Sequence, residues 1–350
     1  MSGRAPSWWY GQGSVMPVLL APLSLLWTAG GGLRQALARP YRSRLPVICI
    51  GNPTAGGGGK TPAAIAVAKL LIALGEKPVF LSRGHGGTLA GPHLVDPKKD
   101  TAAEVGDEPL LLSRVAPAVI SVRRDAGARF AEGIDASIIV MDDGFQNPQL
   151  VKDLSILAVD REAGTGNGRV IPAGPLRAPL AGQLDRAQAL LLTGEGTSGA
   201  DLVRQAAARG LRILEGKLVA APKSPPVKGK RVVAFAGIAR PGKFFDSLSR
   251  AGAKLADRFA FPDHHGFTGA DCERLLQAAS RHKATLVTTE KDFVRIADKR
   301  LARAAVKMPV VLKLADEKAL LDLLKSVLKG RGKAAGRPVR RRASRLPHNA

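Results

Sequence analysis

Short apolar runs alternate with segments of helical spacing along most of the chain. The run 45–51 predicts a buried strand, 61–74 has the spacing of a helix that ends at Gly75, and 78–82 predicts the next strand. Further buried strands are predicted at 118–122, 136–141, 154–159 and 189–192. Because strands that alternate with helices form parallel sheets covered on both faces, we expect an α/β fold.

A second, smaller alternation follows a stretch rich in proline and lysine at 220–231. It predicts strands at 232–237, 255–261, 285–289 and 309–314, and helices at 241–251, 271–282 and 316–328. We therefore divide the chain into an N-terminal segment (1–44), a main α/β domain (45–219), a smaller α/β lobe (220–329) and a tail (330–350). A chain of 350 residues, 45% of them hydrophobic, can supply the cores of two modest domains.

The N-terminal segment contains an apolar run at 15–29 that is interrupted by Pro17 and Pro22. As a helix it would extend roughly 22 Å, which is less than the hydrocarbon thickness of about 30 Å. Aromatic residues precede it and arginines follow it, as in segments at a membrane surface. A signal peptide and a helix packed in the protein core are the alternatives, and we adopt a helix that lies in the membrane interface.

A glycine-rich loop joins the first predicted strand to the first predicted helix, and it contains Thr54, Ala55, Gly56, Gly57, Gly58, Gly59, Lys60 and Thr61. Such a loop lets backbone N–H groups surround phosphates at a helix N-terminus. Lys60 would reach the β- and γ-phosphates and Thr61 would offer its hydroxyl to Mg²⁺, although Thr54 replaces the usual first glycine. A flexible linker would not lie between a buried strand and a helix. The loop therefore predicts a P-loop NTPase-type sheet that binds a nucleoside triphosphate.

Two adjacent acids, Asp142 and Asp143, follow the predicted strand 136–141. Carboxylates at the end of a strand beside a P-loop hold Mg²⁺, directly or through water. An ordinary Asp-Gly turn is the alternative. We assign the Mg²⁺ site to Thr61, Asp142 and Asp143.

The net charge of +24 implies an anionic partner, which would be a nucleic acid, an acidic membrane surface or a phosphorylated substrate. Part of the excess lies between Lys325 and Arg345, where basic residues occur without any acidic one. This tail is predicted to be disordered, either a solubilising appendage or an electrostatic membrane tether. It has no interleaved aromatic residues for stacking on bases, so we expect no nucleic-acid partner. The two cysteines form no framework and favour a reducing compartment.

Several motifs together resemble the tetraacyldisaccharide 4′-kinase family, the lipid A 4′-kinases of Gram-negative bacteria. They occur in order over roughly residues 14–315, and as a set they are specific. The matching stretches are Gly51-Asn52-Pro53-Thr54-Ala55-Gly56-Gly57-Gly58-Gly59-Lys60-Thr61-Pro62, Leu81-Ser82-Arg83-Gly84, Val105-Gly106-Asp107-Glu108-Pro109, Asp142-Asp143-Gly144-Phe145-Gln146, Pro172-Ala173-Gly174-Pro175-Leu176-Arg177, Phe261-Pro262-Asp263-His264-His265 and Thr288-Thr289-Glu290-Lys291-Asp292. Thr54 is typical of this family. A P-loop GTPase would need lysine where Glu290 stands, and no Cys/His cluster suggests metal delivery.

The resemblance implies transfer of the ATP γ-phosphate to the 4′-hydroxyl of a tetraacyl-disaccharide 1-phosphate, in two α/β lobes with a membrane-facing N-terminal helix. It implies that Asp107 is the catalytic base, supported by His264, and that Lys60 acts on the phosphates. We expect a monomer on the anionic cytoplasmic face of the inner membrane. The family usually has glutamate where this chain has Ala178, so Asp142, Asp143 or water must carry more of the metal coordination.

The residues also support this chemistry by themselves, because an alcohol needs a proton acceptor before it attacks phosphorus. A positioned carboxylate is worth roughly 10²–10⁴ in rate, and a nearby imidazole can orient it. The alternatives are that Asp107 only begins a helix and that Asp263-His264-His265 is only a polar turn.

Overall fold

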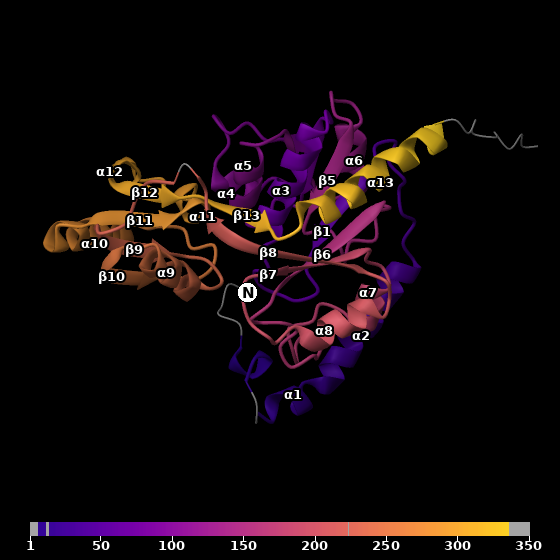
Figure 1. The fold of residues 1–350 in the computed structure, drawn as a ribbon, viewed down its shortest axis with the longest axis horizontal. Helices are drawn as coiled ribbons and strands as arrows, with labels where there is room; N and C mark the ends of the chain where they lie inside the picture. The colour runs from indigo at the N-terminus through magenta and orange to yellow at the C-terminus, as the bar shows by residue number, and fades with distance from the viewer. Residues whose placement is uncertain (1–5, 12–13, 223, 336–350) are drawn as a thin grey trace, which may run out of the picture.

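The computed structural model describes residues 6–11, 14–222 and 224–335, which form two α/β lobes (Figure 1). In this part of the chain a nine-stranded sheet has the order β13-β8-β7-β6-β1-β5-β2-β4-β3. Its strands are β1 (Val47–Gly51), β2 (Pro78–Ser82), β3 (His93–Leu94), β4 (Ala118–Ile120), β5 (Ile138–Asp142), β6 (Leu154–Asp160), β7 (Ala189–Thr193), β8 (Arg212–Ala220) and β13 (Val310–Leu314). The predicted parallel α/β fold is confirmed.

The central strands of this sheet are buried on both faces. Each of β1, β2, β5 and β7 consists entirely of buried residues, and each neighbouring pair among β4, β2, β5, β1, β6 and β7 runs parallel. One face packs against α3 (Lys60–Ala73), α5 (Asp107–Leu112) and α13 (Glu317–Ala335). The other packs against α6 (Arg124–Ala131), α7 (Leu180–Leu184) and α8 (Ala200–Ala207). The short helix α4 (Ala102–Val105) directly precedes α5.

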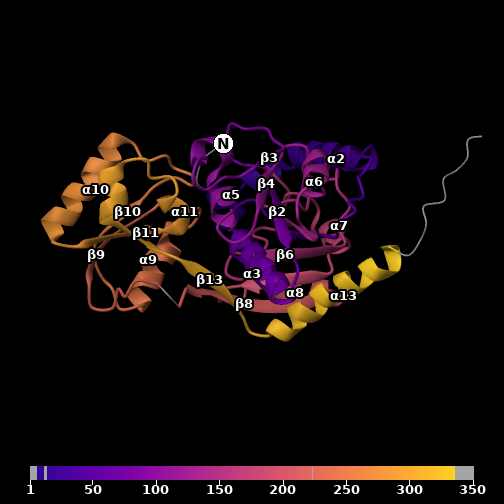
Figure 2. The same ribbon diagram turned by 90° about the horizontal axis from the view of Figure 1, so that it is seen from above.

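The second lobe is a four-stranded sheet in the order β10-β9-β11-β12, as far as the described residues show. Its strands are β9 (Arg231–Ala236), β10 (Lys254–Ala260), β11 (Thr285–Thr289) and β12 (Ala305–Met308), and all three pairs are parallel. The helices are α9 (Pro241–Arg250) on one face, α10 (Gly269–His282) and α12 (Lys299–Ala304) on the other, and α11 (Glu290–Phe293) after β11. Figure 2 shows this lobe beside the end of the large sheet.

The prediction that the last strand and helix belong to the smaller lobe is wrong. Strand β13 pairs antiparallel with β8 at the edge of the large sheet, and Leu320 and Leu324 of α13 lie in the large core. Residues 310–329 therefore belong to the main domain, where β13 covers the edge of the large sheet beside β8. Helix α13 also continues to Ala335, into the predicted tail, and the rest of that tail lies outside the described residues.

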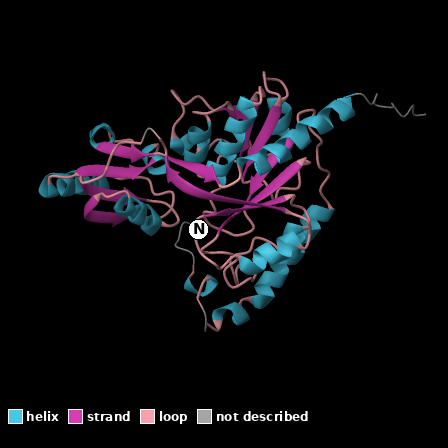
Figure 3. Ribbon diagram, viewed as in Figure 1, coloured by secondary structure: helices cyan, strands magenta, loops and turns pink. Residues whose placement is uncertain are grey.

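The N-terminal segment forms a 3₁₀ turn (Ser7–Trp9), α1 (Met16–Leu19) and α2 (Ala21–Ala36) (Figure 3). It attaches to one loop of the main domain: Trp9 Nε1 donates to the Pro172 carbonyl, and Trp27 Nε1 to the Arg177 carbonyl, each over 3.0 Å. Most of its large apolar side chains are exposed, namely Val15, Val18, Leu19, Leu23, Leu25, Leu26, Trp27, Leu33 and Leu37. The alternative of a helix packed in the core is therefore wrong. In the part of the chain that the structure describes, no helix is both long and apolar enough to cross a membrane.

Candidate active site

The glycine-rich loop connects β1 to α3, and the buried Asn52 holds its shape. The Asn52 side chain accepts hydrogen bonds from the backbone and hydroxyl of Thr54, both at 2.8 Å, and donates to the Gly56 carbonyl at 3.2 Å. Gly59 has a φ of 75°, which an L-residue rarely adopts. A Cβ at Gly58 would lie 2.4 Å from Asn52 Nδ2. Two of the glycines are thus required by backbone shape and close approach.

Lys60 and Thr61 begin α3, at the N-terminus that the loop presents. Lys60 Nζ lies 3.6 Å from an Asp143 oxygen, and Thr61 Oγ1 donates to Asp142 Oδ2 over 2.9 Å. Both acids lie at the end of β5, which pairs with β1. The structure therefore places these four predicted residues together at the carboxyl edge of the sheet, where α/β proteins bind ligands.

The two adjacent acids have opposite electrostatic environments. Burial and the nearby Glu108 raise the pKa of Asp142 to about 7, and its Oδ1 is buried without a hydrogen-bond partner. Burial also disfavours ionisation of Asp143, but Lys60 and Arg177 outweigh it and lower its pKa to about 2. Asp143 is thus already neutralised by cations, whereas Asp142 has an oxygen that lacks a partner.

The loop that ends at Arg177 forms the other side of this site. The Arg177 guanidinium binds both oxygens of Asp143, at 2.7 and 3.1 Å. The same segment is joined to the glycine-rich loop by hydrogen bonds from the Ala55 backbone to the Pro175 carbonyl and from the Arg177 backbone to the Pro53 carbonyl. The Trp27 bond to the Arg177 carbonyl therefore connects the exposed apolar helix directly to the frame of the site.

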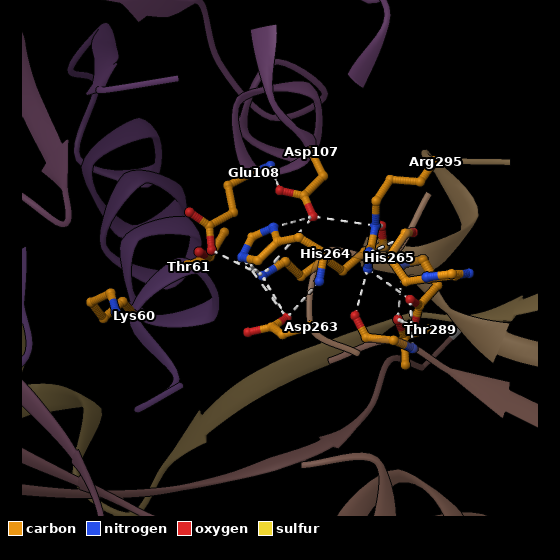
Figure 4. A network of polar contacts seen from close by, with 12 residues as sticks. Lys60, Thr61, Asp107, Glu108, Asp263, His264, His265, Thr289 and Arg295 are labelled. Carbon is orange, nitrogen blue, oxygen red and sulfur yellow. Dashed lines mark hydrogen bonds and ion pairs between the residues drawn. The ribbon is translucent and has the colours of Figure 1, made fainter. Parts of the chain in front are cut away.

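A second polar cluster lies between the lobes (Figure 4). Asp107 begins α5 and is almost completely buried, and its Oδ2 lies 3.1 Å from His264 Nδ1 and 3.3 Å from Arg295 Nε. Burial opposes ionisation of Asp107, but the hydrogen bond from His264 and the charges of Lys291 and Arg295 outweigh it and lower the pKa. Asp107 is therefore a carboxylate throughout the neutral pH range.

The two clusters are adjacent. Glu108, the neighbour of Asp107, is close enough to raise the pKa of Asp142, and its Oε1 lies 3.3 Å from Lys291 Nζ. Figure 4 shows Thr61 on the same side as Glu108, with Lys60 beyond it. A group bound at Lys60 and Thr61 thus lies on the side of the site where Glu108, the neighbour of Asp107, is found (Figure 4).

The comparisons with known proteins agree with this arrangement. A family model described as tetraacyldisaccharide-1-P 4′-kinase matches residues 16–329. The chain belongs to this family. It is 48% identical over 330 residues to the tetraacyldisaccharide 4′-kinase of Azorhizobium caulinodans, covering 93% of this chain and 97% of that protein. It is 49% identical over 321 residues to the protein of the same name from Methylobacterium nodulans, covering 91% and 94%.

A solved structure gives the same result. The crystal structure of LpxK from Aquifex aeolicus in complex with ATP is similar with a TM-score of 0.71 and 26% identity, covering 89% of this chain and 99% of that one. The predicted family, the P-loop-type fold and the enzyme class, a tetraacyldisaccharide 4′-kinase of lipid A biosynthesis, are therefore confirmed.

Within this 4′-kinase, the individual predicted residues differ in how they are used. Thr54 is buried and hydrogen-bonded inside the loop, so its side chain shapes the loop. His264 contacts Asp107, whereas His265 Nε2 is bound to Asp271 at 2.9 Å and its ring stacks on Phe261. The geometry therefore favours His264 over its neighbour as the partner of Asp107.

Several charged residues of the site were not among the predicted ones, namely Glu108, Arg177, Asp263, Lys291 and Arg295. All of these except Arg295 lie in motifs that carry the family resemblance, so the sequence contained a signal for them. Arg295 lies outside those motifs. It binds the His265 and Gly237 carbonyls and Asp292 within its own lobe, and it contacts Asp107 of the main domain. Ala178, where the family usually has glutamate, contributes a carbonyl that accepts from Gln183 Nε2.

Proposed function

We propose that this 4′-kinase binds ATP on the loop of residues 54–61 and transfers the γ-phosphate to the 4′-hydroxyl of a tetraacyl-disaccharide 1-phosphate, with Asp107 as the proton acceptor. The observation that carries this assignment is the Asp107–His264 pair, which comes from two lobes; Glu108, the neighbour of Asp107, acts electrostatically on Asp142, which binds Thr61. A carboxylate in this position serves an alcohol nucleophile, which must lose a proton as it attacks.

The transfer is an in-line displacement. The 4′-oxygen forms a bond to the γ-phosphorus, the bond from that phosphorus to the β,γ-bridging oxygen breaks, and ADP leaves with the bonding electrons. The hydroxyl proton passes to the Asp107 carboxylate. Because Asp107 contacts His264, Lys291 and Arg295 of the second lobe, the acceptor hydroxyl must reach it between the two lobes.

Lys60 and Arg177 supply positive charge where the phosphates develop negative charge. Both contact Asp143 in this structure, at 3.6 and 2.7 Å. We infer that Asp143 holds the two cations in place before ATP binds, and that Lys60 turns to the β- and γ-oxygens when they arrive. Cations fixed before the reaction stabilise a transition state without reorganisation.

The residues present also fit Mg²⁺. The unpartnered, buried Asp142 Oδ1 and the Thr61 hydroxyl beside Asp142 are hard oxygen donors. Among the described residues no group of three or more His, Cys, Asp or Glu side chains could hold a metal, and this suits an ion that takes most of its ligands from water and phosphate. We assign the Mg²⁺ site to Thr61 and Asp142. Asp143 lies beside them and contacts Lys60 and Arg177. When bound there, the ion would neutralise charge on the β- and γ-phosphates.

Replacing Asp142 with asparagine should stabilise the protein at pH 8 when nucleotide and Mg²⁺ are absent. The raised pKa means that protonated Asp142 favours the folded state. This stabilisation is fully present below about pH 4 and is lost as pH rises through about 7. The asparagine side chain carries no charge at any of these pH values. Thermal unfolding should therefore show the variant a few degrees above the parent at pH 8 and no such gain at pH 4.

Addition of Mg-ATP is the control in the same experiment. It should raise the melting temperature of the parent and raise that of the variant much less, because the variant lacks a metal ligand. Equal stabilisation of the two proteins would remove Asp142 from the metal site.

We propose that α1 and α2 lie in an anionic membrane surface, with the active site above it at the cytoplasmic face, and that the enzyme works as a monomer. The exposed leucines of α2 form an apolar surface, and Arg34, Arg39, Arg42 and Arg44 follow them. An amphiphilic acceptor resides in such a surface, so a helix attached to the loop of Arg177 would bring the active site to it.

Leu25→Glu combined with Leu26→Glu should abolish sedimentation with vesicles that contain anionic lipid. Each buried leucine is worth about 1.5–3 kcal/mol, so the pair should weaken binding at least about 100-fold. Activity on detergent-dispersed acceptor should persist. Ile72→Glu, which places a charge on an exposed apolar position of α3, is the matched control and should bind vesicles normally. Normal sedimentation of the double variant would exclude this surface as the membrane contact.

Incubation with γ-labelled ATP and a purified disaccharide 1-phosphate tests the proposed reaction. The label should appear on the lipid, at the 4′-position, and ATP turnover should require the acceptor. Turnover that is unaffected by the acceptor would contradict the assignment and would favour a simple nucleotide hydrolase.

A further inference from the structure

Lys291 occupies the centre of the polar cluster between the lobes. Its Nζ lies 3.2 Å from His264 Nε2, 3.3 Å from Glu108 Oε1, 3.7 Å from Asp263 Oδ1 and 4.0 Å from Asp107 Oδ2. It belongs to α11, whereas Asp107 and Glu108 belong to α5 of the other lobe. One side chain thus contacts both members of the Asp107–His264 pair.

The surroundings keep Lys291 in its charged form. Burial disfavours the ammonium, but Glu108, Asp107 and Asp263 outweigh burial and the neighbouring Arg295, and the pKa of Lys291 is raised. An ammonium group has three N–H donors and no acceptor. Every hydrogen bond of the Lys291 ammonium group is therefore one that it donates.

This donor determines where the proton of His264 lies. Since Lys291 donates to Nε2, that nitrogen carries a lone pair and no hydrogen. The imidazole proton must then lie on Nδ1, from which it is donated to Asp107 Oδ2 at 3.1 Å. A second proton on Nε2 would break the bond to Lys291 and place two cations 3.2 Å apart.

We propose that Lys291 is a positioning residue which holds His264 as a neutral imidazole protonated on Nδ1, so that Asp107 alone accepts the hydroxyl proton. The proposal rests on the assignment of Asp107 as the base. It adds that His264 orients the carboxylate without becoming an imidazolium. An imidazolium beside Asp107 would stabilise the carboxylate and so make it a weaker base.

The other groups that face His264 make Lys291 necessary for this state. Asp107 lies at Nδ1, Asp263 Oδ1 lies 3.8 Å from Nε2, and the His85 ring packs edge-on with the ring centres 5.4 Å apart. A carboxylate near each ring nitrogen can accept a hydrogen bond from it. Among these contacts of the described chain, only Lys291 opposes a hydrogen on Nε2.

Nitrogen NMR of the wild-type enzyme tests the proposal without reference to activity. In protein labelled with ¹⁵N-histidine, two-bond N–H correlations report which ring nitrogen carries the proton, and a His264→Gln sample identifies the signal among the six histidines. We expect His264 to be neutral and protonated on Nδ1 from pH 6 to 8. An imidazolium at pH 7, or a ring protonated on Nε2, would overturn the proposal even if Asp107 is the base.

Lys291→Met extends the test to catalysis. Without the ammonium, nothing at Nε2 opposes a second ring proton, so kcat at pH 7 should fall at least about 10-fold and the acidic limb of the kcat profile should move to higher pH. Activity should recover towards high pH, because loss of the ring proton restores the neutral imidazole. Lys291→Arg, which retains a charged donor, should keep the limb closer to its original position.

Lys299→Met is the matched control, since it removes a lysine from the same lobe at an exposed site without a charged contact in the structure. It should leave the profile unchanged. A loss in Lys291→Met that is equal at every pH would show a structural role and refute the proposal. Failure of the base assignment is recognised separately, by full activity of an Asp107→Asn enzyme.

Discussion

Lys60→Ala is expected to lower kcat/KM by at least about 10³-fold while the protein remains folded. Lys60 is the cation at the N-terminus of α3, and its charge would neutralise the β- and γ-oxygens as negative charge develops on them. Loss of one preorganised donor from such a site commonly costs 10²–10³ in rate. Loss of a full charge in a buried site should cost at least as much, and it should appear in kcat as well as in ATP affinity.

The fold should tolerate this change. Lys60 contacts Asp143, but that carboxylate keeps its bidentate bond with Arg177, so no buried charge is left alone. Lys69→Ala is the control on the same helix, because Lys69 is exposed and lies more than two turns from the loop. Steady-state kinetics and thermal unfolding of both variants decide the matter. Turnover near the wild-type rate by folded Lys60→Ala would remove the central proposal.

Asp107→Asn is expected to lower turnover by roughly 10²–10⁴ with ATP affinity close to normal. Asparagine keeps the size of the side chain and can accept a hydrogen bond from His264, but it is not an effective proton acceptor. The loss is therefore of general-base catalysis, which is worth about that factor, and it should appear in kcat. Equal losses of ATP binding and turnover would instead make Asp107 a ligand of nucleotide or metal.

The same variant has a predictable effect on stability. The lowered pKa means that the ionised carboxylate favours the folded state, an effect that is present above the unfolded pKa and lost as pH falls through the folded one. The variant should thus be less stable than the parent at pH 7, and the difference should shrink below about pH 4. Arg295 retains Asp292 as a partner at 2.7 Å, so folding at neutral pH should survive.

Variants at the two histidines distinguish the role of His264. His264→Ala should cost less than Asp107→Asn, and the double variant should fall short of the product of the two losses, because both residues act on one proton transfer. His265→Ala is the internal control, since His265 binds Asp271 and stacks on Phe261, away from Asp107. A damaging His265→Ala together with a neutral His264→Ala would contradict the assignment.

Much of the main domain could be predicted from local pattern. One supersecondary unit contains the strand β1, the four glycines before Lys60 and the helix that ends at Gly75. Each part can be predicted from its own residues, because a phosphate loop is formed by contiguous residues. The same holds for Asp142 and Asp143 at the end of β5. Strands that were missed, such as β8 and β12, carry charged residues at partly exposed positions, so their apolar pattern is weak.

Local pattern fails where distant segments meet. The apolar run of β13 indicates a strand but does not indicate which sheet it joins. In the structure β13 pairs with β8 at the edge of the large sheet. Likewise the apolar run at residues 15–29 predicts a helix, but only the tertiary structure shows that most of the large side chains of this helix are exposed. Hydrophobicity along a chain does not specify the partner surface.

The sequence by itself determined the family, the class of reaction and the phosphate loop, since each depends on residues that are contiguous or on motifs in a fixed order. Only the tertiary structure decided how the acceptor side of the site is built. Asp107 and His264 are separated by 157 residues and come together because the chain leaves the main domain after β8 and returns through β13. The choice of His264 over His265 and the contact of Lys291 with His264 arise from that approach of the two lobes. The opposite pKa shifts of Asp142 and Asp143 arise from burial and from the charges of Glu108, Lys60 and Arg177, which no local pattern records.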